Sequence, residues 1–110
     1  MKQYINYRTY TDIEPYEVIN STNPRKLTVR AMKFELDPEW EPKWVTGGFA
    51  GCCINQDDQK WLIVPNEGGC VHQMSLRKNG KWQFVGRKTV RGGCVGYLET
   101  EPRRFYDFNF

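Results

Sequence analysis

The chain has 110 residues, of which 39% are apolar and 15% aromatic, and its formal net charge is +3. That length predicts a single domain spanning residues 1–110 that folds without metal or disulfide support, and the high aromatic fraction speaks against disorder. The modest charge argues against a dedicated duplex-DNA binder, which needs a basic stripe for its many phosphate contacts.

The first predicted element is a β-hairpin. Residues 16–19 form a short strand that leads into the breaker cluster Asn-Ser-Thr-Asn-Pro at 20–24. Residues 26–36 follow as a longer strand, in which Leu27 and Val29 alternate with polar neighbours. A breaker cluster between two such runs is typical of a hairpin turn.

The second strand carries apolar side chains on both faces, because Met32, Phe34 and Leu36 lie on the face opposite to Leu27 and Val29. A strand that is apolar on both faces is either central in a sheet or part of a dimer face. The aromatic tail at 105–110 adds more apolar surface than one small sheet covers. We therefore expect a homo-oligomer.

Residues 37–44 are predicted to form an ordered loop. Pro38 and Pro42 remove backbone donors, so this stretch is neither a strand interior nor a stable helix. Trp40 and Trp44 are the side chains expected to pin the loop to the domain.

Two more hairpins are predicted further along the chain. Residues 52–55 and 60–64 flank a polar tip, and residues 70–78 and 81–85 flank Asn79-Gly80. Asn-Gly is a strong signal for a two-residue type I′ turn, in which both central residues have positive φ.

The two-residue turn would place Arg77 opposite Trp82. A last pair of strands is expected at 95–99 and 103–108. The sequence thus predicts an all-β fold with a mainly antiparallel sheet, arranged as a small sandwich or an open barrel. At most one short helical turn is expected, near residues 12–16.

Candidate catalytic and metal-ligating residues are sparse. His72 is the single histidine, and no Ser/His/Asp, Cys/His or metalloprotease motif is present. A Cys₃His zinc site using Cys70 and His72 lacks the usual C-x₂₋₄-C spacing, so we expect the cysteines to be reduced and buried. We therefore expect no enzymatic activity, no cofactor and no bound metal.

The N-terminus has no apolar export segment, and no stretch is long and apolar enough for a spanning helix. The sequence thus predicts a location in the cytoplasm, without membrane association.

Positive charge gathers in the second half of the chain. Residues 59–110 hold nine Lys/Arg against four Asp/Glu, whereas residues 1–58 hold seven against nine. Arginine guanidinium groups bind phosphate through paired hydrogen bonds, and aromatic rings stack on bases. These properties predict an anion-binding site for a phosphorylated small molecule. Its candidate ligand-binding residues are Arg87, Arg91, Arg103, Arg104, Phe105 and Tyr106.

Several segments resemble small β-rich proteins of bacteriophages and prophages. They are residues 11–19 (TDIEPYEVI), 27–30 (LTVR), 77–82 (RKNGKW) and 105–110 (FYDFNF). The chain is similar to the first type of Thoeris anti-defence protein, which sequesters cyclic nucleotide-derived immune signals, and less closely to small anti-CRISPR proteins. No binding motif matches residue by residue, so the candidate site depends on charge and aromatic content alone.

Two functions follow as expectations. The resemblance implies a phage-encoded, non-enzymatic protein that sequesters a nucleotide-derived immune signal in the host cytoplasm. The alternative is an anti-CRISPR-type inhibitor that binds and occludes a host defence protein complex. Such an inhibitor needs an exposed apolar or acidic patch, and the stretch at residues 35–44 is the candidate because it would face a basic nucleic-acid channel.

Overall fold

The predicted all-β fold is confirmed by a computed structural model, which describes residues 2–9, 11–47, 50–86 and 94–107. Side chains at 46, 47 and 50–52 are outside the description. The helical element is a 3₁₀ turn, Gln56–Asp58, and no helix in the described ranges is long and apolar enough to cross a membrane. The strands are β1 (Tyr4–Arg8), β2 (Ile13–Asn23), β3 (Lys26–Ala31), β4 (Lys33–Leu36), β5 (Trp44–Gly47), β6 (Ala50–Cys53), β7 (Trp61–Val64), β8 (Val71–Leu76), β9 (Trp82–Phe84) and β10 (Val95–Glu99).

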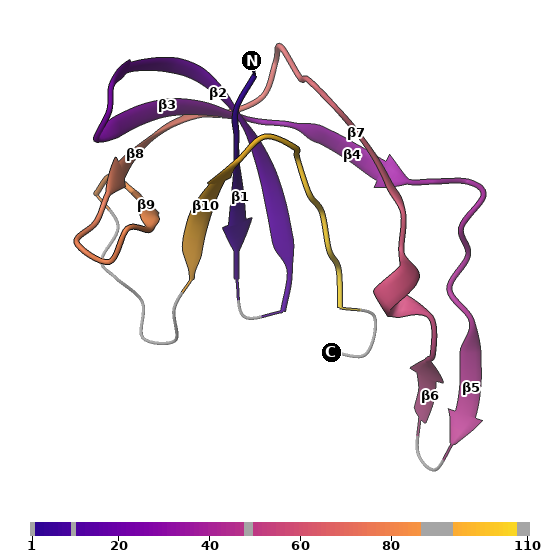
Figure 1. Cartoon of the computed structure of the whole chain (residues 1–110). Helices are drawn as coiled ribbons and strands as arrows, with labels where there is room; N and C mark the ends of the chain where they lie inside the picture. Colours follow the sequence, from indigo (N-terminus) through magenta and orange to yellow (C-terminus); the bar gives the residue numbers. More distant parts are fainter. Residues whose placement is uncertain (1, 10, 48–49, 87–93, 108–110) are drawn as a thin grey trace.

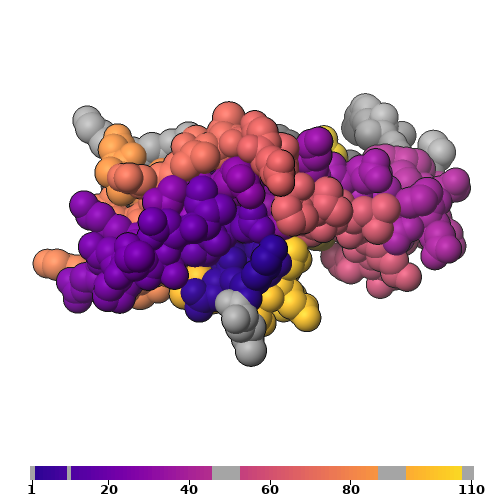
Figure 2. Space-filling model, turned by 90° about the horizontal axis from the view of Figure 1, so that it is seen from above, coloured from indigo at the N-terminus to yellow at the C-terminus, as the bar shows by residue number. Residues whose placement is uncertain are grey.

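Six strands close into an antiparallel barrel in the order β1-β10-β9-β8-β3-β2. The remaining four form two ribbons, β4 with β7 and β5 with β6. In Figure 1 these ribbons extend away from the barrel, so the molecule measures 50 × 31 × 21 Å. We call residues 33–64 the arm. Figure 2 shows its magenta residues gathered at one end of the elongated molecule.

The barrel core is built from alternate residues of its strands. Ile5 and Tyr7 point inward from β1, and Leu27 and Val29 do so from β3, because side chains two residues apart share one face of a strand. The buried cluster is Ile5, Tyr7, Leu27, Val29, Met74, Trp82 and Phe84. Its aromatic rings lie in tilted contact, with Tyr7 and Phe84 centroids 4.8 Å apart.

The turn between β8 and β9 differs from the predicted type I′ turn. Gly80 has a φ of +78°, but no described non-glycine residue, Asn79 included, has a positive φ. The Gly80 N–H donates to the carbonyl of Arg77, which makes a three-residue loop ending in a left-handed glycine. The extra residue shifts the register by one, so Leu76 and not Arg77 lies opposite Trp82.

The arm also differs from the predicted pairing. The predicted strand at 26–36 ends as β3 at Ala31, and β4 leaves the barrel to pair with β7, placing Leu36 opposite Trp61. The strand predicted at 52–55 therefore pairs with β5 and not with residues 60–64. Between the two ribbons, the Asn55 side chain accepts from the Lys43 N–H at 2.7 Å and donates to the Glu41 carbonyl at 2.8 Å. These bonds hold the two sides of the arm together.

The C-terminal segment is not the second strand of a hairpin with 95–99, because β10 pairs with β1 instead. Residues 100–107 run between the barrel and the arm as the tail (Figure 1). The tail makes one bridge to the barrel, in which Phe105 and Ile13 exchange backbone hydrogen bonds of 2.9 and 3.1 Å.

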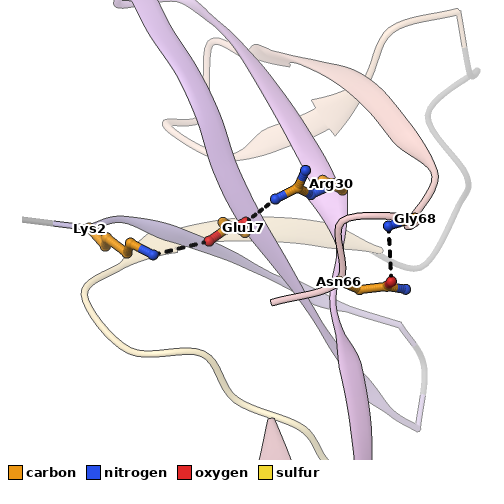
Figure 3. Close-up of polar contacts among 5 residues, drawn as sticks. All are labelled: Lys2, Glu17, Arg30, Asn66 and Gly68. Atoms are coloured by element: carbon orange, nitrogen blue, oxygen red, sulfur yellow. Dashed lines mark hydrogen bonds and ion pairs between the residues drawn. The ribbon is translucent and has the colours of Figure 1, made fainter. Parts of the chain in front are cut away.

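A buried ion pair fixes the register of β2 and β3. Glu17 is buried and lies opposite Arg30, whose Nη2 donates to Oε1 at 2.9 Å, while Lys2 Nζ lies 3.5 Å from Oε2 (Figure 3). An unpaired buried carboxylate is strongly unfavourable, so this pairing opposes slippage next to the irregularity between Val18 and Asn20.

We predict that Gly96→Ala destabilises the barrel. A Cβ at this position would lie 2.7 Å from Ile5 Cγ2 and 3.1 Å from Met74 Cε, and both side chains are fully buried. Overpacking of this kind costs about 1–3 kcal/mol, which urea denaturation would measure as a lower free energy of unfolding. Gly68→Ala is the matched control, since its Cβ would meet only Asn66 Oδ1 at 3.7 Å. Equal losses in the two variants would contradict the close approach at Gly96.

Candidate functional site

The structure brings together part of the predicted anion-binding set, because Arg103, Arg104 and Phe105 line one hollow of about 320 Å³. Arg87 and Arg91 lie outside the described residues. Arg103 and Arg104 are adjacent in the tail, but their guanidinium groups have different partners: Arg103 contacts Glu99, and Arg104 contacts aromatic rings.

Arg104 holds the tail against the arm. Its Cζ lies 4.3 Å from the centroid of the Phe34 ring, 5.1 Å from that of Trp61 and 5.9 Å from that of Tyr106. Its Nη1 also donates to the Ile13 carbonyl at 3.3 Å. A guanidinium above ring faces gains cation–π attraction, so Arg104 connects barrel, tail and arm. With these contacts in place, it is a poor phosphate ligand.

Phe105 and Tyr106 are held by their backbones. The Tyr106 N–H donates to Gln59 Oε1 at 2.8 Å, and Gln59 Nε2 donates to the Tyr106 carbonyl at 2.9 Å. Phe105 is half-buried beside Ile13, while the Tyr106 side chain is exposed. The Gln59 hydrogen bonds fix the tail backbone against the arm.

Arg103 lies on a different feature, a cleft along β1 and β10. Its side chain is 61% exposed, and its Nε is 3.3 Å from Glu99 Oε2. The cleft has a volume of about 830 Å³, and Arg8 and Tyr97 line it together with Arg103. Arg103 also lines a smaller hollow of about 320 Å³ together with Arg104 and Phe105. The cleft along β1 and β10 is the larger of the two, and it adds Arg8 as a second cation beside Arg103.

The arm carries an unusual share of exposed apolar side chains. Trp44 is 54% exposed at the start of β5, and Ile54 is 64% exposed directly after β6. In Figure 1, the β5–β6 ribbon is the one farther from the barrel. Nearer the barrel, Leu62 and Val64 share one face of the β4–β7 ribbon, because they are two residues apart. The exposed large apolar residues of the arm are Phe34, Trp44, Val45, Ile54, Leu62 and Val64, whereas the rest of the described chain contributes five.

The arm is also acidic. Residues 33–64 hold six Asp/Glu against three Lys, a net charge of −3, and the remainder of the chain has a net charge of +6. A hollow of about 680 Å³ beside the buried Trp40 is lined by three acidic residues and two lysines: Glu39, Glu41, Asp58, Lys43 and Lys60. The arm therefore combines apolar side chains with negative charge.

Metal-ligating side chains do not gather in the described ranges. These ranges contain no group of three or more His, Cys, Asp or Glu residues positioned to hold a metal ion. His72 packs edge-on against Tyr16 and Phe84, at centroid distances of 6.1 and 5.2 Å. The expectation that all cysteines are buried is wrong for Cys70, which is exposed in the turn before β8, while Cys53 is buried.

Sequence patterns did not point to Arg8 or Tyr97. Each is isolated in a short strand, and only the pairing of β1 with β10 places them on one wall with Arg103. The sequence singled out residues 35–44 as a candidate apolar or acidic patch, and these residues lie in the arm. The exposure of Ile54, Leu62 and Val64 depends on strand pairings that the sequence did not reveal.

Comparison with known proteins gave no match to any protein-family model, curated protein or solved structure. The resemblance to phage anti-defence proteins stays a prediction.

We predict that Arg104→Ala loosens the tail. Loss of the contacts with Phe34 and Trp61 should lower the free energy of unfolding by about 0.5–2 kcal/mol. Arg104→Lys should lower it less, because a lysine keeps the positive charge near the rings. Amide hydrogen exchange should accelerate at Phe105 and Tyr106. Arg103→Ala is the control, because an exposed ion pair is worth about 1 kcal/mol or less. Unchanged exchange at Phe105 in Arg104→Ala would refute the anchoring role.

Proposed function

We propose that this protein is a non-enzymatic binding protein that uses its arm to bind another protein. The observation that supports this proposal is the concentration of exposed apolar side chains on an acidic arm that extends away from the barrel. Contiguous apolar surface rimmed by polar residues is typical of protein interaction sites.

The arm is organised before any partner arrives. Asn55 joins its two sides through hydrogen bonds to the Lys43 N–H and the Glu41 carbonyl, and Trp40 is buried within it. The Asp37 N–H donates to the Lys60 carbonyl at 2.9 Å, continuing the connection toward the β4–β7 ribbon. A surface that is already ordered loses little conformational entropy on binding, which favours affinity.

The charge of the arm selects a cationic partner surface. A net charge of −3 on residues 33–64 favours association with a basic face that also has an apolar centre. The resemblance to phage anti-defence proteins supports a host defence protein as the partner class. In such a protein, the basic channel for nucleic acid would receive the arm, and occlusion of that channel would inhibit it.

Sequestration of a cyclic nucleotide signal has less support at the residues predicted for it. Arg104 is engaged with Phe34 and Trp61, and Arg87 and Arg91 lie outside the described residues. We therefore rank protein binding through the arm above sequestration by the tail.

Site-specific photo-crosslinking tests the arm. A benzophenone amino acid placed at Ile54 or Leu62 should crosslink to one host protein in phage-infected cells, because both side chains are exposed on the arm. The same probe at Ile19 or Val71, which are exposed on the barrel, should not crosslink to that protein.

Charge reversal on the arm provides the quantitative prediction. With the purified partner, Glu39→Lys combined with Glu41→Lys should weaken binding by about tenfold or more. The difference in affinity between this variant and the parent should become smaller at high salt, because salt screens exposed charges. Glu67→Lys, in the exposed turn before β8, is the matched control and should leave affinity unchanged. Crosslinks from the arm to a second copy alone would contradict a foreign partner and support the predicted homo-oligomer.

A further inference from the structure

The cleft along β10 arises because β10 separates from β9. In the described chain, the two strands share one residue pair, Gly96 with Trp82. Beyond Gly96, β10 continues along β1, with Tyr97 opposite Asn6 and Glu99 opposite Tyr4. The loop before β9 forms part of the opposite wall through Gly80. A cleft of about 830 Å³ opens between them, within the range of small-molecule sites.

One part of the cleft lining is apolar. Leu76, Trp82 and Leu98 contribute side chains to it, and Pro24 of the β2–β3 turn adds a fourth. Tyr97 adds an aromatic ring, whose position is held by Lys81: its Nζ lies 2.9 Å from the tyrosine oxygen and 4.2 Å from the ring centroid. An apolar wall with an aromatic ring favours a flat, poorly hydrated group such as a nucleobase.

The other part of the lining is cationic. Arg8 is exposed, and the described part of the chain gives its guanidinium no hydrogen bond or ion pair. Arg103 has only the exposed contact with Glu99, at 3.3 Å. Two guanidinium groups in one cleft match a phosphate, which accepts paired hydrogen bonds from each of them.

Asn6 organises the cationic part from beneath. Its side chain is 2% exposed, and Oδ1 accepts from the Arg103 N–H at 2.7 Å. Nδ2 donates to Glu99 Oε1 at 3.0 Å and to the Glu101 carbonyl at 2.9 Å. Because one buried amide fixes both the Arg103 backbone and the Glu99 carboxylate, Arg103 is positioned in the cleft without a ligand.

We propose that this cleft binds a nucleoside monophosphate or a close analogue. The phosphate lies between Arg8 and Arg103, and the base rests on the apolar wall beside Tyr97. Glu99 is the intramolecular anion that the phosphate displaces from Arg103, so Glu99 opposes binding. This binding site is separate from the arm, because none of the described arm residues lines the cleft.

Calorimetric titration of the full chain tests the site with adenosine monophosphate, adenosine and inorganic phosphate. The monophosphate should bind more tightly than either fragment. Arg8→Ala and Arg103→Ala should each weaken it by about tenfold or more, since each removes charge-assisted hydrogen bonds. Glu99→Gln should strengthen binding, because it removes the competing charge and keeps an oxygen that accepts from Asn6.

Three controls make the result decisive. Lys33→Ala removes a positive charge from the exposed surface of the arm and should leave affinity unchanged. Thermal unfolding of every variant separates loss of the site from loss of the fold. The double variant Glu39→Lys/Glu41→Lys should bind the nucleotide with the affinity of the parent protein. Nucleotide binding in the cleft can therefore be confirmed or refuted independently of protein binding by the arm. Absence of binding at millimolar nucleotide, or equal affinity in both arginine variants and the parent, overturns the proposal.

Discussion

The contact of Gly96 with Ile5, Met74 and Trp82 is the constraint on which the rest of the structure depends. The absence of a side chain at Gly96 lets β10 approach the barrel interior, and the Gly96–Trp82 pair is the described point where β10 meets β9. With β10 fixed there, Glu99 and the tail that follows are positioned over Asn6. Dense interiors respond to a single added methyl group, so the cleft and the tail both depend on the size of this one residue.

The arm has a different physical basis. A two-stranded ribbon is only marginally stable by itself in water. The two ribbons of the arm gain stability from the buried Trp40 side chain and from the Asn55 hydrogen bonds. Arg104 adds cation–π contacts with Phe34 and Trp61. These contacts lie within the arm or on the side facing the tail. They leave Leu62 and Val64 in solvent. The division between a stabilised side and an exposed apolar side is typical of a surface that is completed by a partner.

The sequence predicted the strand content and the first hairpin well, because alternation and breaker residues are local signals. It failed where pairing is not local: the strand at 95–99 pairs with β1, and residues 60–64 pair with β4 across the whole arm. The candidate site shows the same limit. Arg103 was identified from charge, but its neighbour Arg8 is brought to it only by barrel closure, and the aromatic contacts of Arg104 depend on the path of the arm. Charge and aromatic content can indicate candidate binding residues, but they do not predict which residues the fold places next to them.

The pairing of β1 with β10 has a consequence for synthesis. Residues 4–8 cannot pair with residues 95–99 until those residues have been synthesised, so the barrel closes late in synthesis. The strands of each arm ribbon, by contrast, are closer in sequence than β1 and β10 are, and loop closure makes pairs of smaller separation faster to form. The arm is thus expected to be ordered while Ile5 and Tyr7 still lack part of their enclosure, which makes the nascent N-terminal strands the segment that most needs chaperone protection.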